Sequence, residues 1–322
     1  MRHLSRVITA ALLALPLALA ASPSAQAADP TTLTSGFYVD PSSSPALWAA
    51  ATPGDGRAAA IRDNVATKPM ARWFGNWSGT IGTATGAYVG AADVKDKLPI
   101  LVAYNIPNRD ICGGQSGGGA GSTAAYNEWI AAFAGGIGTR PAVVILEPDS
   151  LGDTNCMNAA QIAERNSLLN NAITQFNQKA PNTWVYLDAG NPGWQSASKM
   201  AANLNAAGLS RAHGFSLNVS NYYGTAQNIT YANSINAALK SSSGYTKPFV
   251  VDTSRNGNGS NNGEWCNSAG RKIGTPSQKG GGAEMLLWIK TPGESDGNCG
   301  VGAGSAAGQF LPEVTYKMIY GY

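Results

Sequence analysis

Two carboxylates follow the most apolar segment of the chain. The stretch AVVILEPDS, residues 142–150, begins as an uninterrupted apolar run and ends in Glu147 and Asp149, which flank Pro148. Only 13% of the residues are charged, so two acids at this place need an explanation. An acid at the end of a buried strand is partly desolvated, which raises its pKa and keeps it protonated near neutral pH. Such a group offers general acid catalysis.

Other polar side chains also stand where apolar segments end. They are Tyr104, Asp188, Asn218, Asp252 and Lys290. If these segments are parallel strands of one sheet, their carboxyl ends lie on one face, and the side chains converge there. Asp252 and Asn218 have an equally good interpretation as loop-capping residues. Glu147, still within its strand, is predicted to be a structural partner, for instance of an arginine.

Nucleophilic hydrolysis is an alternative chemistry. The stretch GQSGG, residues 114–118, matches the G-x-S-x-G motif of serine hydrolases, and His213 follows it in the sequence. That motif needs a strand running directly into the serine, whereas Ser116 stands in a glycine-rich loop well beyond the segment 99–104. His213 begins an apolar segment instead of following one. A serine esterase therefore remains an alternative with the wrong local context.

Phosphate, metal and nucleic-acid chemistry find little support. The stretch SGGGAG, residues 116–121, has no lysine and follows no strand directly, so a loop over a cleft is the better interpretation. No CxxC pair exists, and His213 is the only histidine after residue 28, so we expect no metal and no cofactor. The formal net charge is only +3 and no basic stripe is present, which gives no sign of a nucleic-acid or membrane partner.

Apolar segments alternate with helical patterns along the chain. Strands are predicted at 36–39, 70–74, 99–104, 142–147, 184–188, 214–218, 248–252 and 284–290, and helices at 56–66, 122–134, 158–179, 196–207, 230–240 and 312–320. Continuous apolar strands followed by helices indicate a parallel sheet covered on both faces. The pattern predicts a distorted (β/α) barrel of seven to eight parallel strands, with the active site at their carboxyl ends, and a doubly wound open sheet is the alternative.

The N-terminus and the cysteines point to export. Residues 1–28 combine Arg2 and Arg6, an apolar core and small residues at the end, as a secretory signal peptide does. Residues 29–322 are then predicted to be a single catalytic domain.

Four cysteines in an oxidising compartment predict two disulfides, with three possible pairings. Pairing Cys112 with Cys156 and Cys266 with Cys299 keeps both loops local.

Carboxylates at strand ends suit glycoside cleavage. That reaction needs a protonated acid near the leaving oxygen and, for inversion, a second carboxylate far enough away to admit a water. Tryptophans at strand ends or in loops can stack on sugar rings; these are Trp73, Trp77, Trp194 and Trp265. Trp129, Trp184 and Trp288 lie within helices or strands and are predicted to be core residues.

Nearly the whole chain after the signal peptide resembles glycoside hydrolase family 6, the secreted cellulases. The resemblance rests on motifs in the right order: VAYNIPNRDICGG (102–114), VVILEPDSL (143–151), VYLDAGNPGW (185–194), DTSRNGNG (252–259), GEWCN (263–267) and LWIKTPGESDG (287–297). It implies a distorted α/β barrel and the disulfides Cys112–Cys156 and Cys266–Cys299. It also implies a β-1,4-glucan substrate.

The resemblance implies roles for individual residues. Asp149 is the general acid, and Asp110 raises its pKa and helps to deliver water. Tyr104 assists ring distortion, Asp188 supports the site electrostatically, and Asp296 is the candidate base, directly or through a water chain. The implied sugar contacts are Tyr38, Asp40, Ser116, Asn191, Trp194, Asn221, Trp265, Lys290 and Glu294. Two positions depart from the family pattern: Ile111 separates the RD motif from Cys112, and Asn191 stands where a histidine is usual.

Loop length bears on the mode of action. Exo-acting members of the family carry long loops that roof the cleft into a tunnel, whereas residues 296–312 here form a short, glycine-rich segment. We therefore expect an open cleft and an endo-β-1,4-glucanase. The resemblance implies inversion of the anomeric configuration, and we expect the protein to be secreted and monomeric. A cellobiohydrolase of the same family is the alternative, and a binding protein without activity is disfavoured because Tyr104, Asp110, Asp149 and Asp296 occur together.

Overall fold

A curled sheet of mostly parallel strands forms the centre of the protein. The computed structural model describes residues 28–113 and 116–322, so residues 1–27 of the predicted signal peptide lie outside it. The strands are β1 (Arg72–Phe74), β2 (Ile100–Ala103), β3 (Ala142–Leu146), β4 (Thr183–Asp188), β5 (Gly214–Leu217), β6 (Phe249–Asp252), β7 (Gln278–Lys279) and β8 (Met285–Leu287). They lie in the order β1-β2-β3-β4-β5-β6-β8-β7.

The strand order decides between the two predicted architectures. Seven strands pair in parallel and nearly in chain order, and only the two-residue β7 is antiparallel to its neighbour. A doubly wound sheet would reverse its order at a switch point, which this sheet does not. Its first strand comes close to the segment after β8, because Ala71 N donates to Trp288 O at 2.8 Å and Trp73 Nε1 to Ile289 O at 2.8 Å. The predicted distorted barrel is confirmed.

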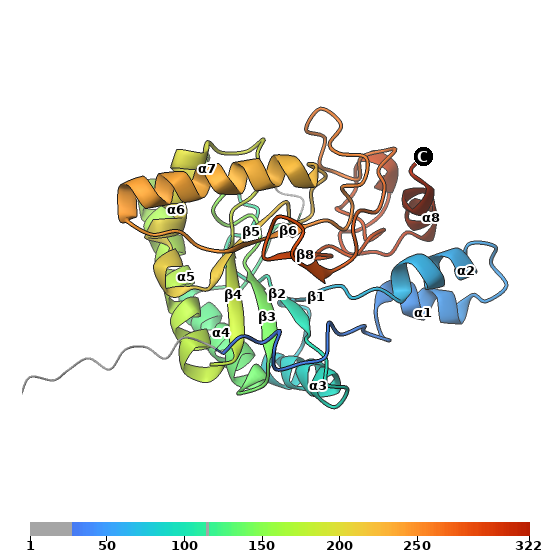
Figure 1. Cartoon of the computed structure of the whole chain (residues 1–322), viewed down its shortest axis with the longest axis horizontal. Helices are drawn as coiled ribbons and strands as arrows, with labels where there is room; N and C mark the ends of the chain where they lie inside the picture. The colour runs from blue at the N-terminus through green and yellow to red at the C-terminus, as the bar shows by residue number, and fades with distance from the viewer. Residues whose placement is uncertain (1–27, 114–115) are drawn as a thin grey trace, which may run out of the picture.

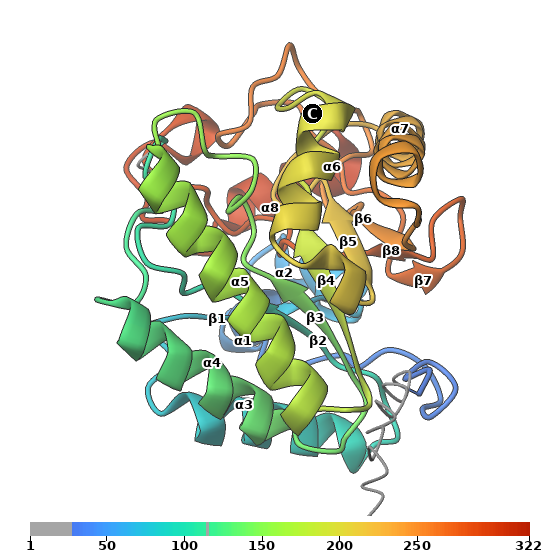
Figure 2. The same cartoon turned by 90° about the vertical axis from the view of Figure 1, so that its left-hand side faces the viewer.

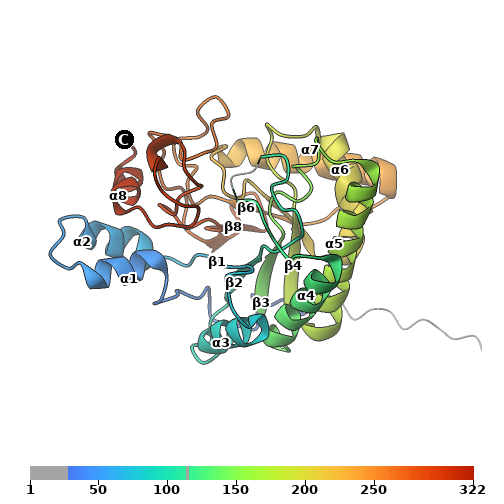
Figure 3. The same ribbon diagram turned by 180° about the vertical axis from the view of Figure 1, so that it is seen from behind.

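Helices cover the outside of this sheet. They are α1 (Ser44–Ala51), α2 (Ala58–Ile61) with the π-helical turn η1 (Arg62–Ala66), α3 (Ile81–Asp93), α4 (Thr123–Ile137), α5 (Ala159–Lys179), α6 (Ala197–Ala206), α7 (Thr225–Ser243) and α8 (Pro312–Tyr320), with 3₁₀ turns η2 (Leu209–Arg211) and η3 (Gly300–Gly302). Helices α3 to α7 follow β1 to β5 and surround the sheet, whereas α1, α2 and α8 lie together at one side (Figures 1 and 3). Figure 2 shows α3, α4 and α5 side by side.

Burial on both faces explains the uninterrupted apolar strands. In β3, the side chains of Ala142, Val144 and Leu146 pack in the cluster under the helices. Val143 and Ile145 instead belong to the cluster inside the barrel. Successive side chains of a strand point to opposite faces, so a strand buried on both sides must be apolar at every position.

One strand predicted from the sequence does not form, and two helices were missed. Residues 36–39 are not a strand, because only Phe37 forms a bridge, to Leu98, before Asp40 accepts from Ser42 N at 2.8 Å and turns the chain. Helix α3 was not predicted, since IGTATGAYVGAAD is rich in residues of low helix propensity and is held by packing against α4. The short α1 was also missed.

Candidate active site

A cleft of about 940 Å³ lies where loops following the strands converge. Four of the five predicted catalytic residues line it: Tyr104, Asp110, Asp149 and Asp296. So do eight of the nine predicted sugar contacts: Asp40, Ser116, Asn191, Trp194, Asn221, Trp265, Lys290 and Glu294. Asp188 and Tyr38 are absent from the lining; Tyr38 is buried against Tyr88, with ring centroids 5.5 Å apart.

The backbone around Asp149 has an unusual conformation. Glu147 and Asp149 have φ angles of 50° and 71°, in the left-handed region, which costs about 1–3 kcal/mol for each non-glycine residue. Two strand ends hold this conformation. Glu147 is fully buried and accepts hydrogen bonds from the backbone amides of Asn105 and Ile106, both at 2.9 Å. The expected arginine partner is wrong: Glu147 ties the loop after β3 to the loop after β2 through amides.

Asp188 holds the other side of this turn. One carboxylate oxygen accepts from the amides of Asp149 at 3.0 Å and Gly190 at 3.1 Å, and the other accepts from Ser216 Oγ at 3.1 Å. Burial raises the pKa of Asp188 to about 6. Asp188 therefore acts on Asp149 through its backbone, from beneath the cleft.

Asp149 stands among other acids. Burial raises the pKa of Asp149 well above its usual range, and the charges of Asp110 and Asp188 add to this effect, followed by those of Asp153 and Asp296. No salt bridge to Asp149 exists among the described residues. This environment favours the protonated form of Asp149 near neutral pH.

The loop that follows β2 brings Asp110 to the cleft. Asp110 Oδ2 accepts from Tyr104 Oη at 3.0 Å and from the backbone amide of Ser116 at 3.1 Å. Arg109 donates to Ser116 O at 2.7 Å and to Tyr104 O at 3.2 Å, and its guanidinium lies 5.2 Å from the Trp77 ring centroid. Burial raises the pKa of Asp110 as well. The inserted Ile111 is exposed, and Ser116 still reaches the cleft.

Asp296 has the opposite environment. Arg255 Nη1 lies 3.0 and 2.8 Å from its two oxygens, and Lys290 Nζ lies 3.7 Å away. Burial acts to raise the pKa of Asp296, but the charges of Arg255 and Lys290, together with hydrogen bonds from Arg255 and the Asn267 amide, hold the pKa below its usual range. Asp296 is therefore an ionised carboxylate at the cleft.

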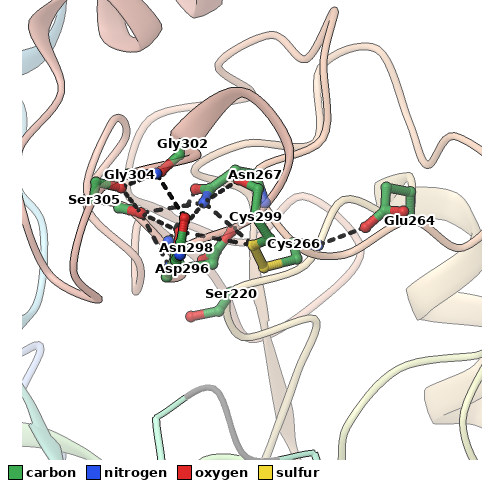
Figure 4. The surroundings of a disulfide bond; sticks show 12 residues. Ser220, Glu264, Cys266, Asn267, Asp296, Asn298, Cys299, Gly302, Gly304 and Ser305 are labelled. Atoms are coloured by element: carbon green, nitrogen blue, oxygen red, sulfur yellow. Dashed lines mark hydrogen bonds between the residues drawn. A yellow bond between two sulfur atoms is a disulfide. The ribbon is translucent and has the colours of Figure 1, made fainter.

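Asn267 connects this carboxylate to a disulfide. Its amide N donates to Asp296 Oδ2 at 3.0 Å, and its Oδ1 accepts from Asp296 N at 2.9 Å. Its Nδ2 donates to Gly297 O at 2.8 Å and to Cys299 O at 3.1 Å. Figure 4 shows Asn267 beside Asp296 and Cys299. Cys299 is bonded to Cys266, the neighbour of Asn267. The disulfides Cys112–Cys156 and Cys266–Cys299 confirm the predicted pairing.

Aromatic rings line the cleft as predicted. Trp73, Trp77, Trp194 and Trp265 all belong to its lining, and the last three are 56%, 37% and 42% exposed. Trp184 and Trp288 are buried, and Trp129 packs against the core. Exposed indole faces in a cleft suit stacking on sugar rings.

Polar side chains extend the lining. Asp40 lies 3.7 Å from Arg72 Nη1, and Glu294 accepts from Ser44 Oγ on α1. Asn191, at the position of the usual histidine, is buried and uses Oδ1 to accept from Gly193 N at 3.0 Å. Asp252 and Asn218 are capping residues: Asp252 accepts from the amides of Ser220 and Ser254, and Asn218 Oδ1 accepts from Tyr223 N.

The serine-esterase alternative is wrong in its geometry. His213 precedes β5, at the end of the strands opposite to the cleft. There its ring stacks on Trp184 with centroids 3.9 Å apart, and Nε2 lies 2.9 Å from a Glu284 oxygen. Ser116 lines the cleft at the other end. The histidine therefore has no access to the serine.

Sequence reasoning assigned no role to Asp153, Arg109, Arg255 or Asn267. All four lie within or beside the quoted motifs. Asp153, Arg255 and Asn267 contact partners that are distant in sequence, whereas Arg109 donates within its own loop. Within residues 28–113 and 116–322, no group of three or more His, Cys, Asp or Glu side chains is placed to hold a metal ion. No helix in these described ranges is both long and apolar enough to span a membrane.

The loops of this barrel bring two carboxylates to an aromatic-lined cleft, one in surroundings that favour its protonated form and one that is ionised. Such a pair of an acid and a base is typical of hydrolases that cleave glycosidic bonds. Residues 33–319 match the model of Glycosyl hydrolases family 6. The chain belongs to this family and is a glycoside hydrolase.

Known proteins resemble the chain along most of its length. Endoglucanase 1 of Streptomyces halstedii is 72% identical over 317 residues, 98% of each protein. Endoglucanase A of Thermobispora bispora is 43% identical over 96% of this chain and 66% of its own length. Among solved structures, the endoglucanase Cel6 from Mycobacterium tuberculosis, in complex with a thio-linked cello-oligosaccharide, superposes with a TM-score of 0.82 at 38% identity, covering 91% of this chain and 99% of that one.

Proposed function

We propose that the protein is an endo-β-1,4-glucanase that hydrolyses cellulose or a related β-glucan with inversion of the anomeric configuration. One observation carries the proposal: the cleft holds two carboxylates in opposite environments, because Asp149 is surrounded by acids, which raise its pKa, and Asp296 is paired with Arg255, which lowers its pKa. An inverting enzyme needs that combination of acid and base.

The residues then act as follows. Asp149 donates its proton to the glycosidic oxygen as the bond to the anomeric carbon breaks. A water attacks that carbon from the opposite face, and its proton passes to Asp296, directly or through a second water. Asp110, held by Tyr104 and the Ser116 amide, orients the water and adds negative charge beside Asp149. Trp73, Trp77, Trp194 and Trp265 stack on the glucose rings, and the polar lining residues bind their hydroxyls.

Endo action is supported by the relatives and by the cleft. Streptomyces halstedii Endoglucanase 1 carries that activity in its name. Loop length supports it as well: residues 296–312 form a short, glycine-rich segment, whereas long loops would be needed to roof the cleft.

The test compares variants on a soluble β-glucan. Asp149→Asn should lose about 10²–10⁴-fold in turnover. Ser116→Ala should lose far less, because the contacts of Ser116 with Asp110 and Arg109 are made by its backbone. The reverse ranking would contradict the proposal, and retention of the anomeric configuration in the first product would contradict inversion.

The mode of action needs its own measurement. The wild-type enzyme should lower the viscosity of carboxymethylcellulose early, while few reducing ends have formed. Release of mainly cellobiose with little loss of viscosity would favour the cellobiohydrolase alternative. Initial rates on cellulose and on mixed-linkage β-glucan would determine the preferred substrate.

We further propose that residues 1–28 are removed on export and that residues 29–322 act as a single, monomeric catalytic domain. Mass spectrometry of the secreted protein should give an N-terminus near Asp29, and light scattering should give the mass of one chain.

A further inference from the structure

Asp153 is a cleft carboxylate for which the proposed reaction has no role so far. It lies one turn after Asp149, and its backbone amide donates to Asp149 O at 2.9 Å. Gly152 N donates to the same carbonyl at 3.1 Å. The Asp153 side chain is half-buried and lines the cleft beside Asp110 and Asp149. It is thus fixed in position relative to the proposed proton donor.

The Asp153 carboxylate also reaches the loop that carries Asp110. Its Oδ2 accepts from the backbone amide of Cys112 at 3.1 Å. The disulfide from Cys112 to Cys156 joins the same two loops next to this hydrogen bond. Asp153 therefore lies at the junction between the loop of Asp110 and the loop of Asp149.

A buried arginine fixes this junction from below. Arg165 on α5 is 4% exposed, and its Nη2 donates to Asn108 O at 2.7 Å. Its Nη1 donates to Ser150 O at 3.2 Å and to Asp153 O at 3.4 Å. These contacts use the Asp153 backbone only, so the carboxylate remains free to act at the cleft.

Several charged groups face Asp149. They are Asp110 from the loop after β2, Asp153 from its own loop, Asp188 from β4 and Asp296 from the loop after β8, and the hydroxyl of Tyr104 lies beside them. Asp153 itself is faced by Asp110 and Asp149, with Arg165 behind it. Each negative charge makes ionisation of Asp149 less favourable.

We propose that Asp153 is a positioning residue for the proton donor: its carboxylate holds the Asp110 loop through the Cys112 amide and adds a negative charge that keeps Asp149 protonated. This proposal rests on the proposed function, in which Asp149 is the acid. The charge on Asp153 is among those that raise the pKa of both Asp149 and Asp110.

Two substitutions separate the parts of this role. Asp153→Asn removes the charge but retains a side-chain oxygen that can accept from Cys112 N. Asp153→Ala removes both. The alkaline limb of the pH profile of kcat reports the loss of the proton from the acid. Without the charge, the pKa of Asp149 falls, so we expect this limb to move to lower pH by about one unit in both variants.

The hydrogen bond from Cys112 N to the Asp153 carboxylate predicts a further difference between the variants. Asp153→Ala should have a KM several-fold above that of Asp153→Asn, because only the alanine variant lacks the hydrogen bond to Cys112. Asp93→Asn is the matched control, since Asp93 is an exposed acid at the end of α3 and its loss should leave the profile unchanged. Thermal unfolding of each variant checks that the fold is intact.

The outcomes are distinguishable. An alkaline limb at the wild-type position in Asp153→Asn would overturn the charge effect, and equal KM values for the two variants would overturn the positioning role. Asp149→Asn, assayed alongside, tests the proposed function itself: if it retains full turnover, the function fails, whereas an inactive Asp149→Asn with unshifted Asp153 profiles refutes only the role of Asp153.

Discussion

Arg255 and Asp296 form a buried ion pair at the cleft. Arg255 Nη1 lies 3.0 and 2.8 Å from the two carboxylate oxygens, and the side chains are only 2% and 4% exposed. A buried carboxylate without a cation is protonated readily, because burial disfavours its charged form. The arginine therefore keeps Asp296 ionised, as the proposed base must be.

Replacing Arg255 tests this dependence. In Arg255→Met the pKa of Asp296 should rise, because burial then acts with less opposition. The acid limb of the pH profile of kcat, where the base becomes protonated, should move to higher pH. Since a buried charge loses its partner, the variant should also be less stable by about 3–5 kcal/mol.

Arg255→Lys serves as the conservative variant, because it retains the charge and should place the acid limb close to that of the wild type. Arg62→Met removes an exposed arginine that pairs with Asp63 and should change neither property. An acid limb in Arg255→Met that coincides with the wild type would show that Arg255 does not control the base.

Glu147 predicts a pH dependence of stability. Burial raises its pKa from 4.5 to about 7, so the folded protein binds this proton more tightly than the unfolded chain does. The contribution of Glu147 is therefore most favourable below pH 4.5 and is lost as the pH rises to 7. That loss amounts to about 3 kcal/mol. Glu147→Gln cannot ionise and should lose less stability between pH 5 and pH 8, as urea unfolding at each pH would show.

Glu128→Gln on the exposed face of α4 is the control and should follow the wild type. Parallel stability curves for the wild type and Glu147→Gln over this range would contradict the prediction.

Gly152 controls the position of the Trp194 ring. A Cβ at residue 152 would lie 2.5 Å from Trp194 Cε3, so Gly152→Ala must displace the ring. If Trp194 stacks on a glucose unit, we expect KM to rise about fivefold to tenfold, which corresponds to the energy of one aromatic contact. Gly135→Ala is the matched control on α4, where a Cβ meets no atom within 4 Å. An unchanged KM in Gly152→Ala would exclude Trp194 from the binding subsite.

Much of the fold follows from patterns within single segments. The run AVVIL predicted a strand buried on both faces, and β3 at Ala142–Leu146 is one. Helix α5 was predicted almost to its ends from a long helical pattern, and in the structure Asn158 and Gln161 form a capping box at its start. Helix α3 and residues 36–39 were misjudged because contacts distant in sequence decide their conformation: α3 packs on α4, and Phe37 pairs once with Leu98.

Neighbours along the chain are enough to predict which acids stand at strand ends, which tryptophans lie at strand ends or in loops, and which cysteine pairs are local. How each acid is used depends on contacts between distant segments. Glu147 and Asp188 bind backbone amides, Asp296 is paired with Arg255, and Asp149 is surrounded by other acids. Those differences arise from burial and from charges on other strands, which no local pattern contains.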